Sequence, residues 1–521
     1  MAAALPLALA ACAVGPNYRA PSATALAVPG RFAATAPDYA APADQAELAR
    51  WWTALDDPLL ETLIAEALAQ GPDIQAAGAR LRQSRGALRS ARASLLPALT
   101  TSASAGHTSR IGSGGTVFTL PGGATGGAGT GLTTGGSNLF ATSGSYETYS
   151  AGLDAAYEVD LFGGVRRSVE AARGDEAAGL EQLRDTQRTI AAEVALDYVT
   201  ARQAQERLGI ARDNLRSQDD TVQIAGWRAQ AGLVSSLDVA QARAQREQTA
   251  ATIPTLATSL VQAASAIGAL IGQAPGDVQK RLADVRPVPV ADRVLGVDLP
   301  LAVLAHRPDV RAAERDLAAA TARIGVAKAE LYPALRLTGS LGGNGTAVGD
   351  ISRFSTGSII GALSAPIFDG GAIRGRIEQA RGAADEALAN YRKAVLTALG
   401  DVENAMAALA NTREREVSLS LAVDQSRAAL LYAQSQYRAG LVDFQTLLDA
   451  ERTLLTSEDG LATARGDRAT ALVQLYKALG GGWQAAPMPA SATPRTRAQV
   501  ELPTLATVGP GPAAEGLEGG S

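Results

Sequence analysis

The side chains that carry most enzymatic and metal chemistry are nearly missing from this chain. Its 521 residues include one cysteine, Cys12, and two histidines, His107 and His306. Catalytic triads and zinc centres each need several such side chains in one place, so this inventory makes both nearly impossible. We expect no enzymatic activity, no metal and no cofactor. A disulfide within the chain is excluded because it needs two cysteines.

The single cysteine stands at the end of an apolar leader. Residues 1–14 read MAAALPLALAACAV, a stretch of signal-peptide length that is too short to cross a bilayer as a helix. Leu9-Ala10-Ala11-Cys12 looks like a bacterial lipobox, whose cysteine carries diacylglycerol. We predict a signal peptide over 1–11 and lipid attachment at Cys12; the alternative is an ordinary signal peptide with a chance cysteine. No later apolar run reaches about 18 residues, so no transmembrane helix is expected in the mature chain.

The composition favours long, thinly packed helices over a thick globular core. Hydrophobic residues make up 46% of the chain, yet Phe, Trp and Tyr together supply only 4%. The apolar content is therefore mostly Ala, Leu and Val, which suits helices. The 47 basic residues against 52 acidic ones give a net charge of −5. Without a basic excess there is no electrostatic footprint for nucleic acid, and we expect none to bind.

An internal duplication organises the chain. Residues 72–104 align without gaps onto 308–340, an offset of 236, with Pro-Asp at the start of both and Leu-x-Pro-Ala-Leu near the end. Farther on, Glu-x-x-Arg-Gly and Ala-Gly-Leu-Val each recur after 208 residues instead. The 28-residue difference coincides with a Gly-, Ser- and Thr-rich insert at about 107–147. Such a segment is typical of an exposed flexible loop.

Apolar residues recur every seven positions in both halves. One series runs from Leu180 to Val222 and the other from Leu388 to Leu430, in the same phase once 208 is added. This repeat is typical of helices that supercoil against neighbours. No proline interrupts 165–230, and a helix of that length extends roughly 100 Å at about 1.5 Å per residue. The alternatives are two separate ordinary helices or a cytoskeletal coiled coil.

Segments beside these helices alternate with a period of two. Between Leu153 and Leu161, apolar side chains point one way while Asp154, Glu158 and Asp160 point the other. One face suits lipid and the other water, although a soluble sandwich shows the same pattern. Each half therefore reads as helix, strand, loop, strand and long helix pair. The predicted strands lie at about 98–106, 150–162, 334–342 and 355–368.

Four strands cannot close a barrel in a membrane. An open sheet edge in hydrocarbon leaves backbone groups unpaired at a cost of several kcal/mol each, and the smallest barrels use about eight strands. The chain must therefore self-associate. Two copies would give eight strands and a filled interior, whereas three would give twelve strands and a lumen. Asp154, Glu158 and Asp160 are predicted to line that lumen.

Motifs along nearly the whole chain resemble those of the TolC-like outer membrane efflux proteins. The resemblance is closer still to their lipoprotein branch, the outer membrane subunits of resistance-nodulation-division pumps. The most specific motifs are Arg307-Pro-Asp-Val-Arg-Ala-Ala-Glu314, Ile324-Gly-Val-Ala-Lys-Ala329, Tyr437-Arg-Ala-Gly-Leu441 and Leu448-Asp-Ala-Glu-Arg452.

The resemblance implies a mixed α and β membrane protein. Its fold would be a trimeric twelve-stranded transmembrane β-barrel, four strands per chain, continuous with a long periplasmic coiled-coil barrel. Its function would be that of a passive exit duct for drugs or other small toxic compounds. The duct would lie in the outer membrane of a Gram-negative bacterium. Its implied partners are outer membrane lipid, a periplasmic adaptor and an inner membrane transporter of the resistance-nodulation-division type.

The predicted organisation places two repeats between terminal segments. The segments are a signal peptide at 1–11, an N-terminal lipid anchor and equatorial segment at 12–71, a first repeat at 72–275 with its helix pair at about 165–275, an equatorial linker at 276–306, a second repeat at 307–483 with its helix pair at about 372–479, and a disordered tail at 484–521.

A glycine turn interrupts each long helix pair. A glycine after a strong helical pattern is a stop signal, so each segment is at least a turn. The resemblance further implies that these turns are periplasmic tips that contact the adaptor. Val442 stands where some family members carry a basic residue, so their gating salt bridge need not carry over. The predicted tip residues are Gly232, Leu233, Val234, Ser235, Gly440, Leu441 and Val442.

The resemblance also implies a periplasmic gate near the tips. It places Asp449 in an acidic ring that narrows the entrance, and Arg452 and Tyr437 in a latch to a neighbouring helix near Asp238. A solvated local ion pair between Asp449 and Arg452 is the alternative, because three positions apart they share a helix face. Gln445 stands four positions before Asp449, where an apolar residue is expected, so a purely hydrophobic seal is not predicted.

Two other function classes stay open beside the efflux duct. One is an outer membrane duct of a type I protein secretion system, and the other is a coiled-coil envelope protein without a channel. The lipobox and the Arg-Pro-Asp-Val motif favour efflux of drugs or metals over protein secretion. Selection of the exported compound lies mostly in the pump of such systems.

Overall fold

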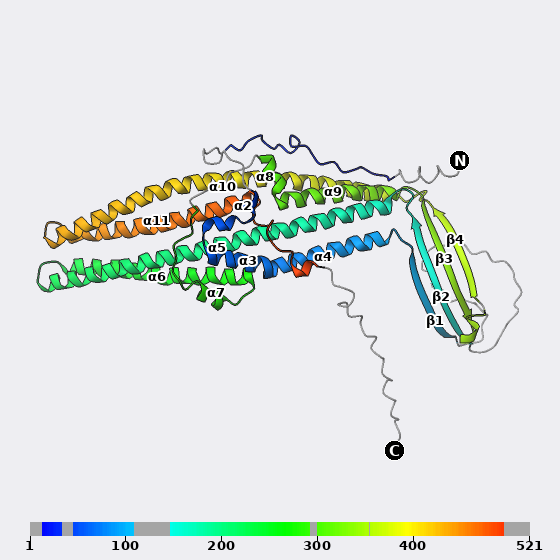
Figure 1. Cartoon of the computed structure of the whole chain (residues 1–521), viewed down its shortest axis with the longest axis horizontal. Coiled ribbons are helices and arrows are strands. Elements are labelled where there is room, and N and C mark those ends of the chain that lie inside the picture. The colour runs from blue at the N-terminus through cyan, green and yellow to red at the C-terminus, as the bar shows by residue number, and fades with distance from the viewer. Residues whose placement is uncertain (1–12, 34–44, 109–145, 292–299, 354, 494–521) are drawn as a thin grey trace, which may run out of the picture. The chain divides into compact units, whose positions relative to one another are not determined.

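The chain is described from a computed structural model, shown in Figure 1. Its elements fall into two units, one with the four strands and the helix ends that adjoin them, and one with the remaining helices. Cys12, the predicted signal peptide and most of the Gly-rich insert lie outside the described residues. The described ranges are 13–33, 45–108, 146–291, 300–353 and 355–493.

The strands of the first unit make one antiparallel sheet in the order β1-β2-β3-β4. Its register aligns Val159, Leu335 and Leu363 in one row across β2, β3 and β4. The alternating apolar side chains of these strands therefore share one face of the sheet. The strands are β1 at Ala98–Thr108, β2 at Tyr146–Val159, β3 at Ala334–Gly345 and β4 at Ser355–Ser364.

The sheet has no covering layer among the described residues. Every residue of β1 and of β4 is exposed, and Ile359 retains 90% of its accessible surface. A lone four-stranded sheet with apolar residues in water cannot bury a core. Its faces and its two outer edges need lipid or further protein.

The second strand of each hairpin ends earlier than predicted, and an aspartate caps the helix that follows it. Asp160 accepts hydrogen bonds from the amides of Val165 (3.2 Å) and Arg166 (2.9 Å), which caps the next helix instead of extending β2. Asp369 accepts from the Ile373 amide at 2.7 Å in the same way. β2 thus ends at Val159 and β4 at Ser364, so the predicted strands at 150–162 and 355–368 are wrong at their ends, and Asp160 lies in the turn after β2.

The long helices follow the offsets of the duplication. Helices α5 (Gly164–Gln230) and α10 (Ala372–Arg438) each have 67 residues and begin 208 apart. Helices α4 (Pro72–Ala93) and α9 (Pro308–Ala329) each have 22 residues and begin 236 apart. Each half of the chain therefore folds into the same series of elements.

Two further helices turn back along the long ones. Figure 1 shows α6 (Ser236–Ile271) beside α5 and α11 (Phe444–Ala478) beside α10. Among the described residues, α6 alone is long and apolar enough to cross a membrane. Leu256 of α6 packs on Leu208 of α5, so its apolar side serves the helix bundle. The short helices are α2 at Gln45–Ala49, α3 at Pro58–Gln70, α7 at Pro275–Arg281 and α8 at Pro300–His306, with 3₁₀ turns η2 at Trp51–Leu55, η3 at Val348–Asp350 and η4 at Ala490–Ala492.

The main core of the second unit lies where these short helices meet the long ones. Trp51 of η2 stacks on Tyr476 of α11, with ring centroids 5.3 Å apart. The seven-residue series is buried here: Val194 of α5 and Val395 and Val402 of α10 are 0% exposed. Full burial of each such side chain stabilises the fold by about 1.5–3 kcal/mol.

The start of the C-terminal tail belongs to this packed region. The carbonyl oxygen of Pro487 accepts a 2.9 Å hydrogen bond from Gln187 of α5. Ala492 is 0% exposed, and its carbonyl accepts a 2.9 Å bond from Arg85 of α4. The prediction of a disordered tail from 484 onward is therefore wrong for 484–493. Residues 494–521 lie outside the described part of the chain.

Candidate functional site

The glycine turns that join the long helix pairs have the same backbone geometry. Gly232 and Gly440 have φ angles of +72° and +75°. The amides of Leu233 and Leu441 reach back to the carbonyls of Arg228 and Gln436 at 2.8 and 2.9 Å. This is the Schellman arrangement, in which the left-handed residue is nearly always glycine. The sequence predicts both turns for this reason.

The residue before each returning helix caps it. Ser235 and Asp238 form a reciprocal capping box, with the Ser235 amide donating to the Asp238 carboxylate at 3.0 Å. Asp443 accepts from the Thr446 amide at 2.8 Å. Asp238 is therefore engaged at its own helix end, and no contact in the described structure joins it to Tyr437 or Arg452. Within one chain Asp238 thus serves its own helix end, and its part in a latch stays a prediction.

Apolar side chains are exposed at both turns. Leu233 is 67% exposed and Leu441 is 76% exposed. Leu237, in the first turn of α6, is 62% exposed. Val234 and Val442 are partly buried. Exposed leucines on a tight turn offer an apolar contact surface that the turn does not need for its own stability.

A small core beneath the turns joins the two helix pairs. Tyr437 of α10 is 4% exposed, and its ring lies 5.6 Å from that of Phe444 of α11. Arg228 of α5 places its guanidinium 4.4 Å from the Tyr437 ring centroid and donates to the Tyr437 carbonyl at 3.1 Å. Tyr437 thus does bind a neighbouring helix pair, through Arg228.

Three of the predicted gate residues meet on one face of α11. Asp449 accepts from Gln445 at 3.0 Å and from Arg452 at 3.3 Å. Arg452 also donates to Gln245 of α6 at 3.1 Å, so it does link α11 to another helix. The side chains of Asp449 and Arg452 are about half exposed, at 56% and 53%. Solvent weakens such a pair to less than about 1 kcal/mol.

A buried acidic residue, Glu451, lies two positions after Asp449 in α11. Glu451 is 3% exposed and accepts a 2.6 Å hydrogen bond from the Thr221 hydroxyl of α5. Burial raises the pKa of Glu451, and the bond from Thr221 lowers it by less. Glu451 was not predicted from the sequence, although its place in the Leu-Asp-Ala-Glu-Arg motif was a possible signal. Arg228, Thr221 and Gln245 were not predicted either, because their partners lie far away along the chain.

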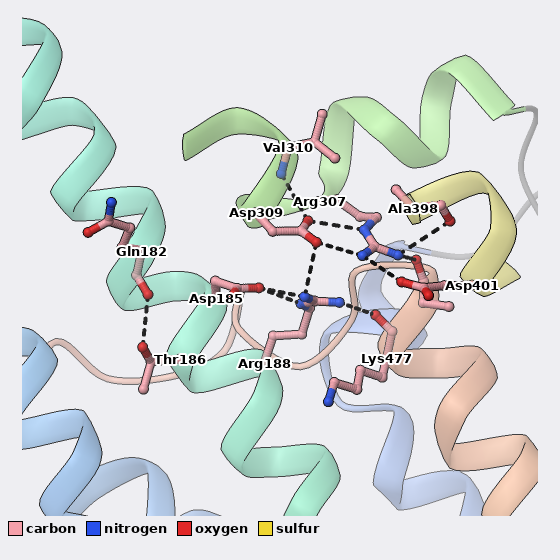
Figure 2. Close-up of polar contacts among 11 residues, drawn as sticks. Gln182, Asp185, Thr186, Arg188, Arg307, Asp309, Val310, Ala398, Asp401 and Lys477 are labelled. Atoms are coloured by element: carbon pink, nitrogen blue, oxygen red, sulfur yellow. Dashed lines mark hydrogen bonds and ion pairs between the residues drawn. The ribbon is translucent and has the colours of Figure 1, made fainter. Parts of the chain in front are cut away.

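The Arg307-Pro-Asp-Val motif lies far along the helices from the turns and ties several of them together. The Arg307 side chain is 3% exposed and donates to Asp309 at 2.6 Å and to Asp401 of α10 at 3.0 Å (Figure 2). It also donates to the carbonyls of Ala398 and Ala478, at 3.4 and 3.1 Å. The motif is therefore structural, since it fastens the start of α9 to α10 and α11.

A second arginine extends this network to α5. Arg188 donates to the Lys477 carbonyl at 2.8 Å and to Asp309 at 3.4 Å, as Figure 2 shows. Burial alone would raise the pKa of Asp309. The hydrogen bond from Arg307 and the charges of Arg188 and Arg307 outweigh burial, so the pKa lies below its usual value.

The described residues contain no group of three or more His, Cys, Asp or Glu side chains arranged to hold a metal ion. The site thus consists of turns, helix contacts and a polar face.

The sequence profile described as outer membrane efflux protein matches residues 63–273 and 299–481. The chain belongs to the outer membrane efflux protein family. This outer membrane efflux protein is accordingly an efflux channel of the Gram-negative outer membrane, and its family consists of transport ducts.

Curated relatives match this efflux protein along nearly its whole length. The pyoverdine export outer membrane protein OpmQ of Pseudomonas aeruginosa is 30% identical over 92% of this chain and 95% of its own. The toluene efflux pump outer membrane protein TtgF of Pseudomonas putida is 32% identical over 92% and 96%. Nodulation protein T of Rhizobium leguminosarum bv. trifolii is 29% identical over 92% and 96%.

Solved structures share the fold of this efflux protein. The outer-membrane channel OprN matches with a TM-score of 0.77 and 35% identity, over 91% of this chain and all of its own. VceC from Vibrio cholerae matches with a TM-score of 0.71 and 26% identity, over 84% of this chain and 99% of its own. The predicted family and the mixed α and β fold are therefore confirmed.

Proposed function

We propose that this efflux channel is a homotrimer that forms a passive exit duct. Three chains contribute four strands each to a twelve-stranded transmembrane barrel, and their helices form a periplasmic tunnel. The observation that carries this proposal is the open sheet, whose outer strands β1 and β4 are exposed along their whole length. Pairing β4 of one copy with β1 of the next satisfies both edges, as a membrane requires.

The duct works with two partners in this proposal. A periplasmic adaptor contacts the tips, and an inner membrane transporter of the resistance-nodulation-division type supplies the energy. Support comes from the exposed Leu233 and Leu441 and from relatives that are named as parts of efflux pumps. The exported compounds are small and toxic to the cell. This agrees with relatives named for toluene efflux and pyoverdine export better than with a protein secretion duct.

The predicted gate residues take their place in this duct. Three copies of Asp449 near the axis repel one another and attract cations, so they narrow and polarise the entrance. Gln445 and Arg452 hold each Asp449 side chain from the same helix. The contacts of Arg452 with Gln245 and of Tyr437 with Arg228 hold the helix pairs together in the closed state.

A lipid anchor at Cys12 completes the proposal. Several acyl chains on one residue, added to a barrel, make membrane attachment effectively permanent. We expect mass spectrometry of the mature amino terminus to find an acylated Cys12. An unmodified cysteine, or cleavage at another bond, would contradict the anchor without touching the duct.

Imaging and conductance of the purified full chain test the proposed function together. We expect electron microscopy to show a hollow cylinder with threefold symmetry, and planar bilayers to show small currents from a mostly closed channel. A monomer with full strand content would refute the assembly. A trimer that conducts nothing, even after the tip contacts are cut, would refute the duct.

A further inference from the structure

The layer around Glu451 is only partly satisfied in hydrogen bonds. Glu451 Oε1 accepts from Thr221, but Oε2 has no hydrogen-bond partner among the described residues. Gln218 lies one turn before Thr221, is 3% exposed, and has no partner there for either atom of its amide. Buried polar atoms without partners cost about 1–3 kcal/mol each. Such a layer is a place where α5 and α11 separate easily.

No charged side chain in the described structure neutralises an ionised Glu451. The arginines along the four helices near this layer are engaged elsewhere or exposed. Their partners are Asp449 and Gln245 for Arg452, Asp219 and Glu247 for Arg246, Glu458 for Arg427, and the ring and carbonyl of Tyr437 for Arg228. Arg243, Asp220 and Asp424 nearby are exposed to solvent, as is Arg438, which lines the same cleft as Thr221.

Solvent stands close to the Glu451 contact. An open cleft of about 570 Å³ lies between α5, α10 and α11, and Thr221 is one of its lining residues. Tyr437 and Leu447 line the same cleft. Because Thr221 touches both the cleft and Glu451, water needs to pass only this side chain to reach the carboxyl group.

We propose that Glu451 is a proton-dependent positioning residue, which holds α11 against α5 when protonated and releases it when ionised. The inference rests on the proposed duct, because the helix it positions carries the gate residues. Burying a protonated carboxyl group costs little free energy, and its carbonyl oxygen still accepts a hydrogen bond from Thr221. A carboxylate without a counter-charge needs water, which separation of the helices supplies.

The direction of the pH effect follows from proton linkage. The closed packing raises the pKa of Glu451 above its ordinary value of 4.5, so the closed state binds the proton more tightly than an open, hydrated state. This contribution to closure is fully present below the ordinary pKa and is lost as pH rises through the raised pKa. One proton per chain limits the change in the open-to-closed ratio to about tenfold per pH unit and chain.

Glu451→Gln and Thr221→Val test the proposal in the full-length channel. Conductance in planar bilayers is followed between about pH 5 and 8, with amide hydrogen exchange of residues 444–458 measured in parallel. Wild type should open as pH rises, and its exchange rates relative to the intrinsic base-catalysed rates at the same pH should rise with it. Glu451→Gln cannot ionise and should stay closed and protected. Thr221→Val removes a hydrogen bond to Glu451 that only the closed packing makes, so the variant should open more at every pH and reach half-opening at lower pH.

A surface carboxyl serves as the matched control. Glu247 on α6 has a side chain that is 67% exposed, and Glu247→Gln should keep the wild-type profile.

The outcomes separate the two proposals. A flat wild-type profile, or equal profiles for wild type and Glu451→Gln, would overturn the role of Glu451. If Glu451→Gln does not assemble, the comparison of wild type with Thr221→Val tests the role of Glu451. An unchanged pH of half-opening in Thr221→Val would contradict the contact between Thr221 and Glu451. If no variant conducts at any pH, the duct fails, and hydrogen exchange of 444–458 still tests the proton-dependent contact.

Discussion

Arg307 illustrates, at the scale of single residues, how this protein buries charge. Its guanidinium presents five donors in a rigid plane, and two carboxylates and two carbonyls from three helices receive them. Lysine has three donors on a flexible stem and cannot match this geometry. Burial of an arginine is tolerable here because all five of its donors find acceptors, two of which are carboxylates that carry the opposite charge.

Arg307→Ala should destabilise the fold by about 3–5 kcal/mol, because Asp309 is then left without its main partner. Arg415 offers a control, since its bridge to Asp467 is about half exposed (50% and 43%). Arg415→Ala should cost less than about 1 kcal/mol. Denaturant midpoints of the two variants measure the difference, and equal midpoints would contradict a structural role for the Arg307 motif.

Arg452→Ala should increase single-channel conductance, because it removes the bond to Gln245 that joins α11 to α6. The side chain is half exposed, so each contact is worth about 0.5–1 kcal/mol. Three contacts in a trimer then change the open population by roughly tenfold or more. Asp449→Asn should instead weaken cation preference in salt-gradient reversal potentials. If conductance and selectivity are unchanged while the trimers stay intact, Asp449 and Arg452 do not form the gate, and Phe444 and Gln445 are the next residues to test.

At the scale of elements, the length of the helices and the geometry of their turns decide where the candidate site lies. Each 67-residue helix ends in a left-handed glycine, and a capped helix returns from it. A Cβ at Gly440 would meet no atom within 4 Å. The glycine is therefore needed for its backbone conformation and not for space.

Gly440→Ala should destabilise the closed hairpin by about 1 kcal/mol, because alanine disfavours a positive φ angle. Gly382 lies inside α10, is exposed, and also has free space around it. Gly382→Ala should stabilise the helix by roughly 0.5–1 kcal/mol. Hydrogen exchange at 436–446 and thermal unfolding should therefore shift in opposite directions for the two variants; a shift in the same direction would argue against the turn geometry.

Sequence periodicity was sufficient to predict the helices and strands but not the contacts between them. Seven-residue and two-residue patterns predicted the helices and strands, because burial repeats with the geometry of each element. The predicted strand ends were wrong after Val159 and Ser364, where the chain turns toward helices that Asp160 and Asp369 cap. The tail was wrongly predicted to be disordered at Ala492, because a segment rich in Pro, Gly and Ala carries no hydrophobic pattern that indicates burial. Glu451 was missed because its meaning depends on Thr221, 230 positions earlier.

At the scale of the whole molecule, the sheet sets the assembly. Its four strands leave β1 and β4 as open edges with exposed apolar residues, and only closure into a ring removes such edges. The chain is thus incomplete as a single copy in a membrane. In the proposed trimer, closing the barrel and forming the assembly are therefore the same event.

Chemical crosslinking of the detergent-solubilised full chain should proceed through dimers and stop at trimers. Three copies close twelve strands with a lumen, whereas two close eight around a filled interior. Increasing the crosslinker should raise the trimer band without larger species. A ladder that continues past three, or one that ends at two, would contradict the twelve-stranded ring.

The equal length of α5 and α10 limits how this gene can change over time. An insertion in one long helix would push its turn away from the other turn and rotate every following side chain by about 100° per residue. A tolerated change would have to add about seven residues, two helical turns, to both halves at once. Mutation of a single site cannot supply that pair of events. The two long helices can therefore change in sequence, but their lengths can change only together.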